Sequence, residues 1–334
     1  MSSPDCPPDC DTETDATDTN AGDQCDPLLC CFAFLTLSGC RNRVTQKLLY
    51  FPPSPPMYTI ENDTFWCVDI DENNVKHSPI SPPDMAFTKI PTAAGNHIAT
   101  LFLPTSPPSP LTILFSHGNA ADLGAMKPFL QAMARKLNAN IFAYDYSGYG
   151  LSTGVPTPRN TLLDAEAAFD YMVKTYPAET QQVIVYGQSL GSAPTTWLGK
   201  TRPEKVSGVV VHSGLGSALR CIRPVRDTCW YDIFPNVDWV RDVQAPLFVI
   251  HGTNDQGIHV RHGETMVKNA QRPYQPWYVL GGGHNDIELN FRTMYYRKLK
   301  NFVTDVREGT CVNIKDVVPA SQDKGSSQPQ ALSM

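Results

Sequence analysis

Residues 183–196 read VIVYGQSLGSAPTT, in which an apolar, β-branched run ends abruptly in the sequence GQSLG. Small residues that are compatible with a helix follow this turn. In a strand–turn–helix of this kind, Ser189 would adopt a strained backbone conformation at the strand end, and the flanking glycines would prevent steric clashes. A G-x-S-x-G pattern alone arises by chance in about one chain in ten of this length. The surrounding sequence must therefore support the motif.

Short apolar runs alternate with segments of helical spacing from about residue 85 onward. The apolar runs predict buried strands, and the amphipathic segments predict helices. Strands are expected at residues 97–103, 111–115, 140–144, 183–186, 206–211, 247–251 and 276–280, and helices at 126–137, 160–175 (with Asn160 as its N-cap), 190–200, 259–270 and 285–303. This order predicts an α/β fold with a mostly parallel central sheet and helices on both faces. Function in such sheets gathers at the carboxyl ends of the strands.

Residues at these strand ends include a candidate nucleophile, acid and base. A serine hydroxyl needs a histidine to accept its proton, and the histidine needs a carboxylate to orient it. The typical chain order is serine, acid, histidine. We expect Ser189 to be the nucleophile, Asp255 after the strand LFVIH to be the acid, and His284 after a triple glycine to be the base. The alternatives lie in the preceding connection or in the helix after the acid: Asp232, Asp238, Asp242, His259 and His262.

The same chemistry requires hydrogen-bond donors for a developing oxyanion. We expect one donor to be the backbone N–H of Leu190, at the start of its helix. The second should be Asn119, in the loop after LTILF, where Gly118 would allow a close approach. The connection 212–245 is too short for a large lid, so a small lid or none is expected. Other polar residues near strand ends are interpreted as structural, either buried or capping the last helix: His117, Asp145, His251 and Asp286.

The first 40 residues hold six of the ten cysteines. The apolar run 28–37 has ten residues, whereas a spanning helix needs about 20. Acidic residues precede the run and basic residues follow it, which does not fit a secretory signal. Cysteines in a short apolar stretch beside basic residues favour reversible S-acylation. The candidates are Cys25, Cys30, Cys31 and Cys40. The alternative is a hydrophobic helix that docks on the body of the protein with reduced thiols.

Composition argues against several other classes. Residues 1–26 carry eight acidic residues and no Lys or Arg, so without this segment the net charge changes from −6 to +2. The nearly neutral remainder gives no indication of a nucleic-acid surface. The cysteines lack nearby histidine partners and paired CxxC knuckles, so no zinc site is expected. No motif predicts another metal or a cofactor.

These patterns divide the chain into four regions. Residues 1–24 are an acidic extension that we expect to be disordered. Residues 25–57 form a cysteine-rich membrane-anchoring segment and a stiff, proline-rich connector. Residues 58–305 form the α/β domain, and the mostly polar residues 306–334 are predicted to be a disordered tail.

Together these residues resemble the α/β-hydrolase superfamily and, within it, the alpha/beta hydrolase domain-containing protein 17 family. The resemblance runs from about residue 25 to 304 and rests on KLLYFPPSPPMY (47–58), SHGNAADLG (116–124), YDYSGYGLSTG (144–154), YGQSLGSAPT (186–195), IFPNVD (233–238), IHGTND (250–255) and GGGHND (281–286). It implies an α/β-hydrolase fold and a membrane-tethered serine hydrolase that cleaves palmitoyl thioesters on cysteines of other membrane-bound proteins. By position it carries over Ser189 as nucleophile, Asp255 as acid and His284 as base.

Two other functions share part of this pattern. A carboxylesterase or lipase acting on small or lipid esters would use the same triad, because each reaction passes through a tetrahedral oxyanion. A catalytically silent hydrolase fold that serves as a membrane scaffold is the third hypothesis, and the intact triad argues against it. We expect a monomer on the cytoplasmic face of plasma and endosomal membranes, with S-acylated membrane proteins as its substrates.

Overall fold

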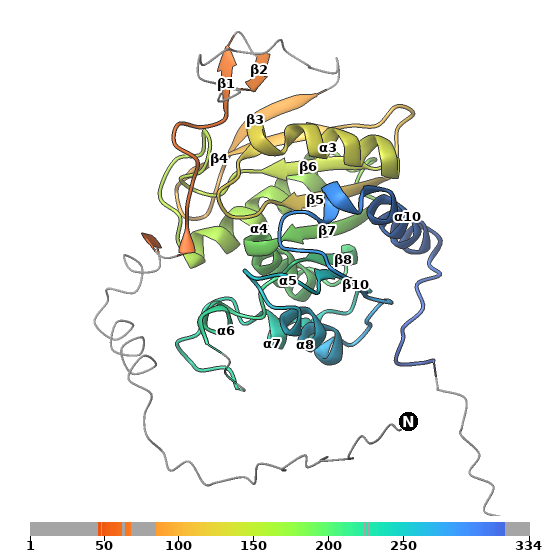
Figure 1. Cartoon of the computed structure of the whole chain (residues 1–334). Helices are drawn as coiled ribbons and strands as arrows, with labels where there is room; N and C mark the ends of the chain where they lie inside the picture. The colour runs from red at the N-terminus through yellow and green to blue at the C-terminus, as the bar shows by residue number, and fades with distance from the viewer. Residues whose placement is uncertain are drawn as a thin grey trace, which may run out of the picture.

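A twisted eight-stranded sheet runs through the centre of the molecule (Figure 1). The computed structural model describes residues 46–47, 49–61, 64–67, 85–223, 225 and 227–317. The strand order is β10-β9-β8-β7-β5-β6-β4-β3, in which β4 pairs antiparallel with both of its neighbours and every other pair is parallel. The strands are β3 (Ala86–Pro91), β4 (His97–Leu103), β5 (Leu111–Ser116), β6 (Asn140–Tyr144), β7 (Gln182–Gln188), β8 (Val206–His212), β9 (Leu247–Gly252) and β10 (Trp277–Val279).

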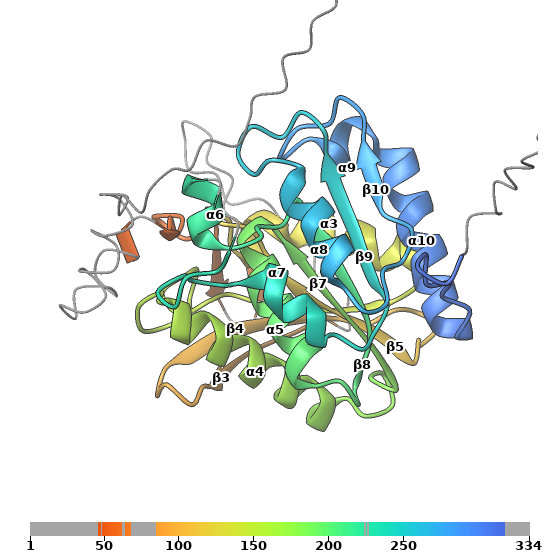
Figure 2. The same cartoon turned by 90° about the horizontal axis from the view of Figure 1, so that it is seen from below.

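Helices cover both faces of this sheet (Figures 1 and 2). One face packs against α3 (Leu123–Leu137) and α10 (Arg292–Glu308), and the other against α4 (Pro158–Thr175), α5 (Ser192–Thr201), α7 (Asn236–Trp239) and α8 (Arg261–Asn269). The central strand β7 supplies both layers, because successive side chains of a strand point to opposite faces. Val183 and Val185 lie in the α4–α5 layer, and Ile184 and Tyr186 lie in the α3–α10 layer. The predicted mostly parallel sheet with two helical layers is confirmed.

Most of the predicted elements are present, and they differ mainly at their ends. The N-cap of α4 is Thr157 rather than Asn160, because the Thr157 hydroxyl accepts a hydrogen bond from the Asn160 N–H at 3.1 Å. The predicted last helix is divided into the short α9 (Ile287–Asn290) and the long α10. Among the described residues of the connection after β8, the elements are short: α6 (Ala218–Ile222), α7 and a 3₁₀ turn.

The carboxyl-terminal boundary of the domain lies later than the sequence predicts. α10 continues to Glu308, and Gly309 ends it in the left-handed conformation with a φ of 71°. The Ile314 N–H then donates to the Pro273 carbonyl at 3.0 Å. The prediction of a tail from residue 306 is therefore wrong for residues 306–317. Residues 306–308 continue α10, and the segment that follows is bonded to the domain through Ile314. Residues 318–334 lie outside the described residues.

The segment Leu49–Met57, which we call the strap, belongs to the domain. The Tyr50 side chain is only 4% exposed, and its hydroxyl shares a hydrogen bond with Thr161 Oγ1 at 2.9 Å. At the other end, the Met57 N–H donates to Asp122 Oδ2 at 2.7 Å. A small hairpin of β1 (Tyr58–Glu61) and β2 (Thr64–Cys67) follows. The predicted domain boundary at residue 58 is therefore wrong, because the strap buries an aromatic ring in the core.

The predicted acidic extension, residues 1–24, and the candidate acylation sites Cys25, Cys30, Cys31 and Cys40 lie outside the described residues. Within the described ranges, no helix combines the length and the apolar character needed to cross a membrane.

Candidate active site

Ser189 lies in the sharp turn between β7 and α5, with a φ of 51°. A non-glycine residue in this left-handed region is strained, and tight packing around it maintains the conformation. Glycines allow that packing. A Cβ at Gly187 would overlap the carbonyl of Gly191, and a Cβ at Gly191 would overlap the carbonyl of Ser116 on β5. The turn therefore presents the Ser189 side chain at the carboxyl edge of the sheet, as the sequence pattern predicts.

The His284 imidazole bridges Ser189 and Asp255. Its Nε2 lies 3.0 Å from Ser189 Oγ, and its Nδ1 lies 2.7 Å from Asp255 Oδ2. With a proton on Nδ1, the imidazole donates to the carboxylate and accepts from the serine hydroxyl. The three side chains predicted from sequence thus form one hydrogen-bonded chain, although they lie on loops after β7, β9 and β10.

The loop that carries His284 is held against the end of β9 by backbone contacts. The Asn254 N–H donates to the Gly282 carbonyl at 2.9 Å. A Cβ at Gly252 would overlap that same carbonyl, so only glycine permits this approach. The packing fixes the distance between the loop bearing the histidine and the loop bearing the carboxylate.

Asp255 is a buried carboxylate that several donors stabilise. Its Oδ1 accepts from the N–H groups of Gly257 at 2.9 Å and Ile258 at 2.7 Å, and its Oδ2 accepts from His284. His251 Nε2 lies 3.4 Å from Oδ2. Burial acts to raise the pKa of Asp255, but the hydrogen bonds outweigh it and hold the pKa below its ordinary range. The carboxylate is therefore charged at neutral pH, and it can stabilise the positive charge that the imidazole would gain on taking the serine proton.

The two predicted oxyanion donors both border the space in front of Ser189. Leu190 opens the helical turn that continues into α5, so its backbone N–H lies at a helix N-terminus. The Asn119 side chain faces the strap instead, since its Nδ2 donates to the Leu49 carbonyl at 2.8 Å. Because the side chain is bonded to the strap, the backbone N–H of Asn119 is the candidate donor to an oxyanion. The packing of the protein does not require glycine at position 118, because a Cβ there would meet no atom closer than 3.7 Å.

Two cavities meet at Ser189 and Asn119. The first cavity, of about 370 Å³, has apolar walls formed by Leu49, Leu215, Ala218, Ile222, Phe234 and Ile258. The second cavity, of about 440 Å³, is lined by Met126, Phe129, Gln188, His284, Glu288 and Leu289. Both volumes lie in the range typical of sites for small organic groups. His284 borders the second cavity only.

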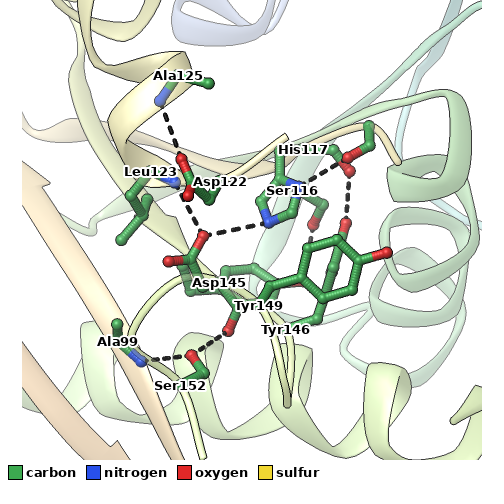
Figure 3. A network of polar contacts seen from close by, with 12 residues as sticks. Ala99, Ser116, His117, Asp122, Leu123, Ala125, Asp145, Tyr146, Tyr149 and Ser152 are labelled. Atoms are coloured by element: carbon green, nitrogen blue, oxygen red, sulfur yellow. Dashed lines mark hydrogen bonds and ion pairs between the residues drawn. The ribbon is translucent and has the colours of Figure 1, made fainter. Parts of the chain in front are cut away.

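A buried polar network supports the loop that follows β5 (Figure 3). The His117 ring is buried, and its Nε2 lies 3.4 Å from Asp145 Oδ1. The same Oδ1 accepts from the Leu123 N–H at 2.9 Å, and the Tyr146 hydroxyl donates to the His117 carbonyl at 2.7 Å. These contacts agree with the structural interpretation of both residues. They fix the path of the chain that carries Asn119.

Two other predicted roles are corrected. Asp286 precedes the short α9 rather than capping the last helix, and its carboxylate accepts from the Gly283 N–H at 2.7 Å. It therefore stabilises the loop that carries His284. His259 lies before α8 rather than within it, while His262 Nδ1 accepts from the Gly216 N–H at 2.9 Å.

The chain is similar in sequence to known hydrolases. A family model described as serine aminopeptidase, S33, matches residues 108–228. Human alpha/beta hydrolase domain-containing protein 17B is 38% identical over 281 residues, which cover 83% of this chain and 95% of that protein. The alpha/beta hydrolase domain-containing protein aho-3 of Caenorhabditis elegans is 36% identical over 278 residues, which cover 83% of this chain and 80% of that protein.

The chain belongs to the alpha/beta hydrolase domain-containing protein 17 family. Solved structures support its fold. The Pyrococcus furiosus esterase Pf2001 superposes with a TM-score of 0.56 at 16% identity, covering 66% of this chain and 92% of that one. Est1E from Butyrivibrio proteoclasticus superposes with a TM-score of 0.54 at 15% identity, covering 66% of this chain and 99% of that one. This member of the family is therefore a hydrolase with the α/β-hydrolase fold.

Sequence reasoning missed a carboxylate beside the site of this family member. Glu288 lies in α9, four residues after His284, and its Oε1 accepts from Gln188 Nε2 at 3.3 Å. Its Oε2 lies 3.8 Å from Nε2 of His212, and burial raises the pKa of the Glu288 carboxyl. Burial also lowers the pKa of His212 to about 3, so its imidazole is neutral. Glu288 thus connects the start of α9 to the residue before Ser189. Its nearness to His284 in the sequence was the only signal for it.

The Gly191→Ala variant tests the packing of the turn. We expect a loss of about 1–3 kcal/mol in the free energy of unfolding, because the new methyl group would overlap the Ser116 carbonyl. Gly118→Ala is the matched control and should change this free energy by less than about 1 kcal/mol. Urea unfolding followed by circular dichroism measures both. Equal stabilities of the two variants would contradict the account of the turn.

Proposed function

We propose that this protein is a serine hydrolase that removes palmitoyl groups from cysteines of membrane-associated proteins. The observation that carries the proposal is the hydrogen-bonded chain from Ser189 through His284 to Asp255, with an apolar cavity beside the serine. The resemblance of the segments around these residues to the family supports the thioester as substrate. No metal or cofactor takes part in the proposed chemistry.

The geometry suits a two-step acyl transfer. Ser189 Oγ attacks the thioester carbonyl while His284 Nε2 takes its proton, and the backbone N–H groups of Leu190 and Asn119 receive the developing oxyanion. His284 then gives the proton to the cysteine sulfur as the carbon–sulfur bond breaks. The cysteine departs as a thiol, and the acyl group remains bonded to Ser189 Oγ. A water molecule then gives a proton to the same imidazole and attacks the acyl-enzyme carbonyl. The ester bond breaks, the imidazole returns the proton to Ser189 Oγ, and the fatty acid is released. Asp255 stays ionised and stabilises the imidazolium in both steps.

The two cavities suit two parts of such a substrate. The leaving sulfur receives its proton from His284 Nε2, so the cysteine side of the substrate must occupy the second cavity, which His284 borders. The acyl chain then occupies the first cavity, which has apolar walls. Each methylene buried there contributes about 0.8 kcal/mol to the free energy of binding.

A carboxylesterase or lipase is the second candidate function. The same apolar cavity accepts the acyl chain of an oxygen ester as readily as that of a thioester, and the triad serves either leaving group. The cysteine-rich amino-terminal segment favours the first candidate.

Acylated cysteines would bring the site to its substrate. We propose that Cys25, Cys30, Cys31 and Cys40 carry acyl chains and hold the protein at the cytoplasmic face of membranes, since two or more chains give stable attachment. Leu49, which lines the first cavity, lies nine residues after Cys40. Nine residues span at most about 30 Å, so an acylated Cys40 keeps the cavity near the bilayer.

The catalytic assignment predicts distinct kinetic effects. Ser189→Ala should abolish turnover of a palmitoyl-cysteine peptide, and Asp255→Asn should lower kcat by about 10⁴-fold, because an asparagine favours the wrong imidazole tautomer. Asp242→Asn, which alters an exposed carboxylate paired with Lys200, should stay within about twofold of wild type. Release of free thiol measures all three. Full activity of Ser189→Ala would refute the proposal.

The anchor assignment predicts that serine at positions 25, 30, 31 and 40 removes hydroxylamine-sensitive acyl label and moves the protein from the membrane to the soluble fraction. The matched control places serine at the four cysteines of the described domain, Cys67, Cys221, Cys229 and Cys311, and should keep both label and membrane binding. Label that persists in the first variant would overturn the anchor assignment and leave the catalytic one unaffected.

The cavity assignment predicts a change in chain-length preference. Cys221 borders the first cavity and is exposed at the surface, so Cys221→Trp can fill the cavity without disturbing the core. We expect at least a tenfold loss of turnover for palmitoyl substrates and a change of less than about twofold for acetyl substrates. Cys221→Ser is the matched control and should behave as wild type. Equal losses for long and short chains would contradict the assignment.

A further inference from the structure

We infer that the strap, Leu49–Met57, is a positioning element of the active site, which holds Asn119 so that its backbone N–H faces the oxyanion. This inference rests on the proposed function and adds to it a segment that lies far from the triad in sequence. The strap joins the candidate acylation sites to the domain, so the part of the chain nearest the membrane would also shape the site.

The Asn119 side chain carries the link. Its Oδ1 accepts from the Phe51 N–H at 2.9 Å and from the Tyr149 hydroxyl at 2.7 Å, and its Nδ2 donates to the Leu49 carbonyl at 2.8 Å. Oδ1 also accepts from the N–H of Ala120, which has a φ of 57°. The amide is thus held on both of its polar atoms by strap backbone, and the strained residue after it is fixed by the same oxygen.

Tyr149 completes the link between the strap and the loop. Its hydroxyl donates to Asn119 Oδ1 and accepts from the Phe51 N–H at 3.1 Å. The Tyr149 ring packs edge-on against the Tyr50 ring, with centroids 6.5 Å apart. Tyr50 is itself buried and bonded to Thr161. The strap is therefore anchored in the core beside the point where it holds Asn119.

The carboxyl-terminal end of the strap also contacts the loop between β5 and α3, at Asp122. Asp122 Oδ2 accepts from the Met57 N–H, while Asp122 Oδ1 accepts from the Ala125 N–H at 3.0 Å and so caps α3. A Cβ at Gly124 would overlap the carbonyl of Met57, so the strap backbone lies directly on the start of the helix. The loop between β5 and α3 is thus clamped by the strap at Asn119 and at Asp122.

The consequence for catalysis follows from the geometry of oxyanion binding. Loss of one oxyanion donor lowers kcat by about 10²–10³-fold. Displacement of the donor lowers kcat by less, and it affects kcat more than KM because the donor binds the oxyanion of the transition state. The strap also supplies Leu49 to the wall of the first cavity. One segment therefore positions the donor and borders the space for the acyl chain.

Two variants at one exposed position separate this role from simple packing. The Phe51 side chain is 55% exposed, so Phe51→Ala keeps the backbone N–H and loses little packing. Phe51→Pro removes the N–H that donates to Asn119 and Tyr149. Tyr149→Phe keeps the packed ring and removes the bridging hydroxyl. The assay uses the full chain with p-nitrophenyl butyrate and the rate of phosphonylation by a fluorophosphonate probe, and the end-point stoichiometry of labelling counts folded sites.

We expect Phe51→Pro and Tyr149→Phe to lower kcat and the labelling rate by about tenfold, with KM within about threefold and full end-point labelling. Phe51→Ala should stay within about twofold of wild type. Unchanged kcat in Tyr149→Phe, or equal losses in Phe51→Pro and Phe51→Ala, would overturn the inference. Absence of labelling in the wild type would instead overturn the proposed function itself, so the two failures are distinguishable.

Discussion

The site depends on backbone packed directly against backbone at the carboxyl edge of the sheet. Gly191 lets the start of α5 rest on the Ser116 carbonyl of β5, and Gly252 lets the end of β9 rest on the Gly282 carbonyl. Each contact brings two loops closer than any side chain would allow. The first contact sets Ser189 beside the loop that carries Asn119, and the second sets His284 beside Asp255. The 3.0 Å and 2.7 Å hydrogen bonds of the imidazole are possible because both contacts are made.

A second constraint is the buried negative charge of Asp255. An isolated carboxylate at this depth would be costly, so it is stabilised by two backbone N–H groups and by His284. Its pKa falls below the ordinary value of 3.8. The stability that this group contributes is therefore present above about pH 4 and is lost as the pH falls through the lower, folded-state pKa. The charge that orients the imidazole thus also contributes to the stability of the fold at neutral pH.

The sequence alone was sufficient for the elements whose signal is local. The strand ending at Ser189, the helix α4 and the strand before Asp255 follow from hydrophobic period and glycine placement. The arrangement of Ser189, His284 and Asp255 could be predicted because parallel strands end at one edge of a sheet, which brings residues distant in sequence together.

The strap and the position of Glu288 could not be predicted in this way. The strap has an irregular backbone rich in proline, and its place depends on hydrogen bonds to Asn119 and Asp122 that are distant in sequence. Prolines indicated an extended segment correctly, but composition does not tell whether such a segment stands free or lies on a domain. Residues 309–317 were missed for the same reason, since they contact the α8–β10 connection through backbone and through the side chains of Asn313 and Lys315.

Peptide mapping by mass spectrometry, after the full chain reacts with a fluorophosphonate probe, directly tests whether His284 activates Ser189. We expect a single adduct on the peptide that contains Ser189, and no adduct when His284 is replaced by glutamine, because the hydroxyl then lacks its base. An adduct on any other residue, or equal labelling of Ser189 without His284, would contradict this activation.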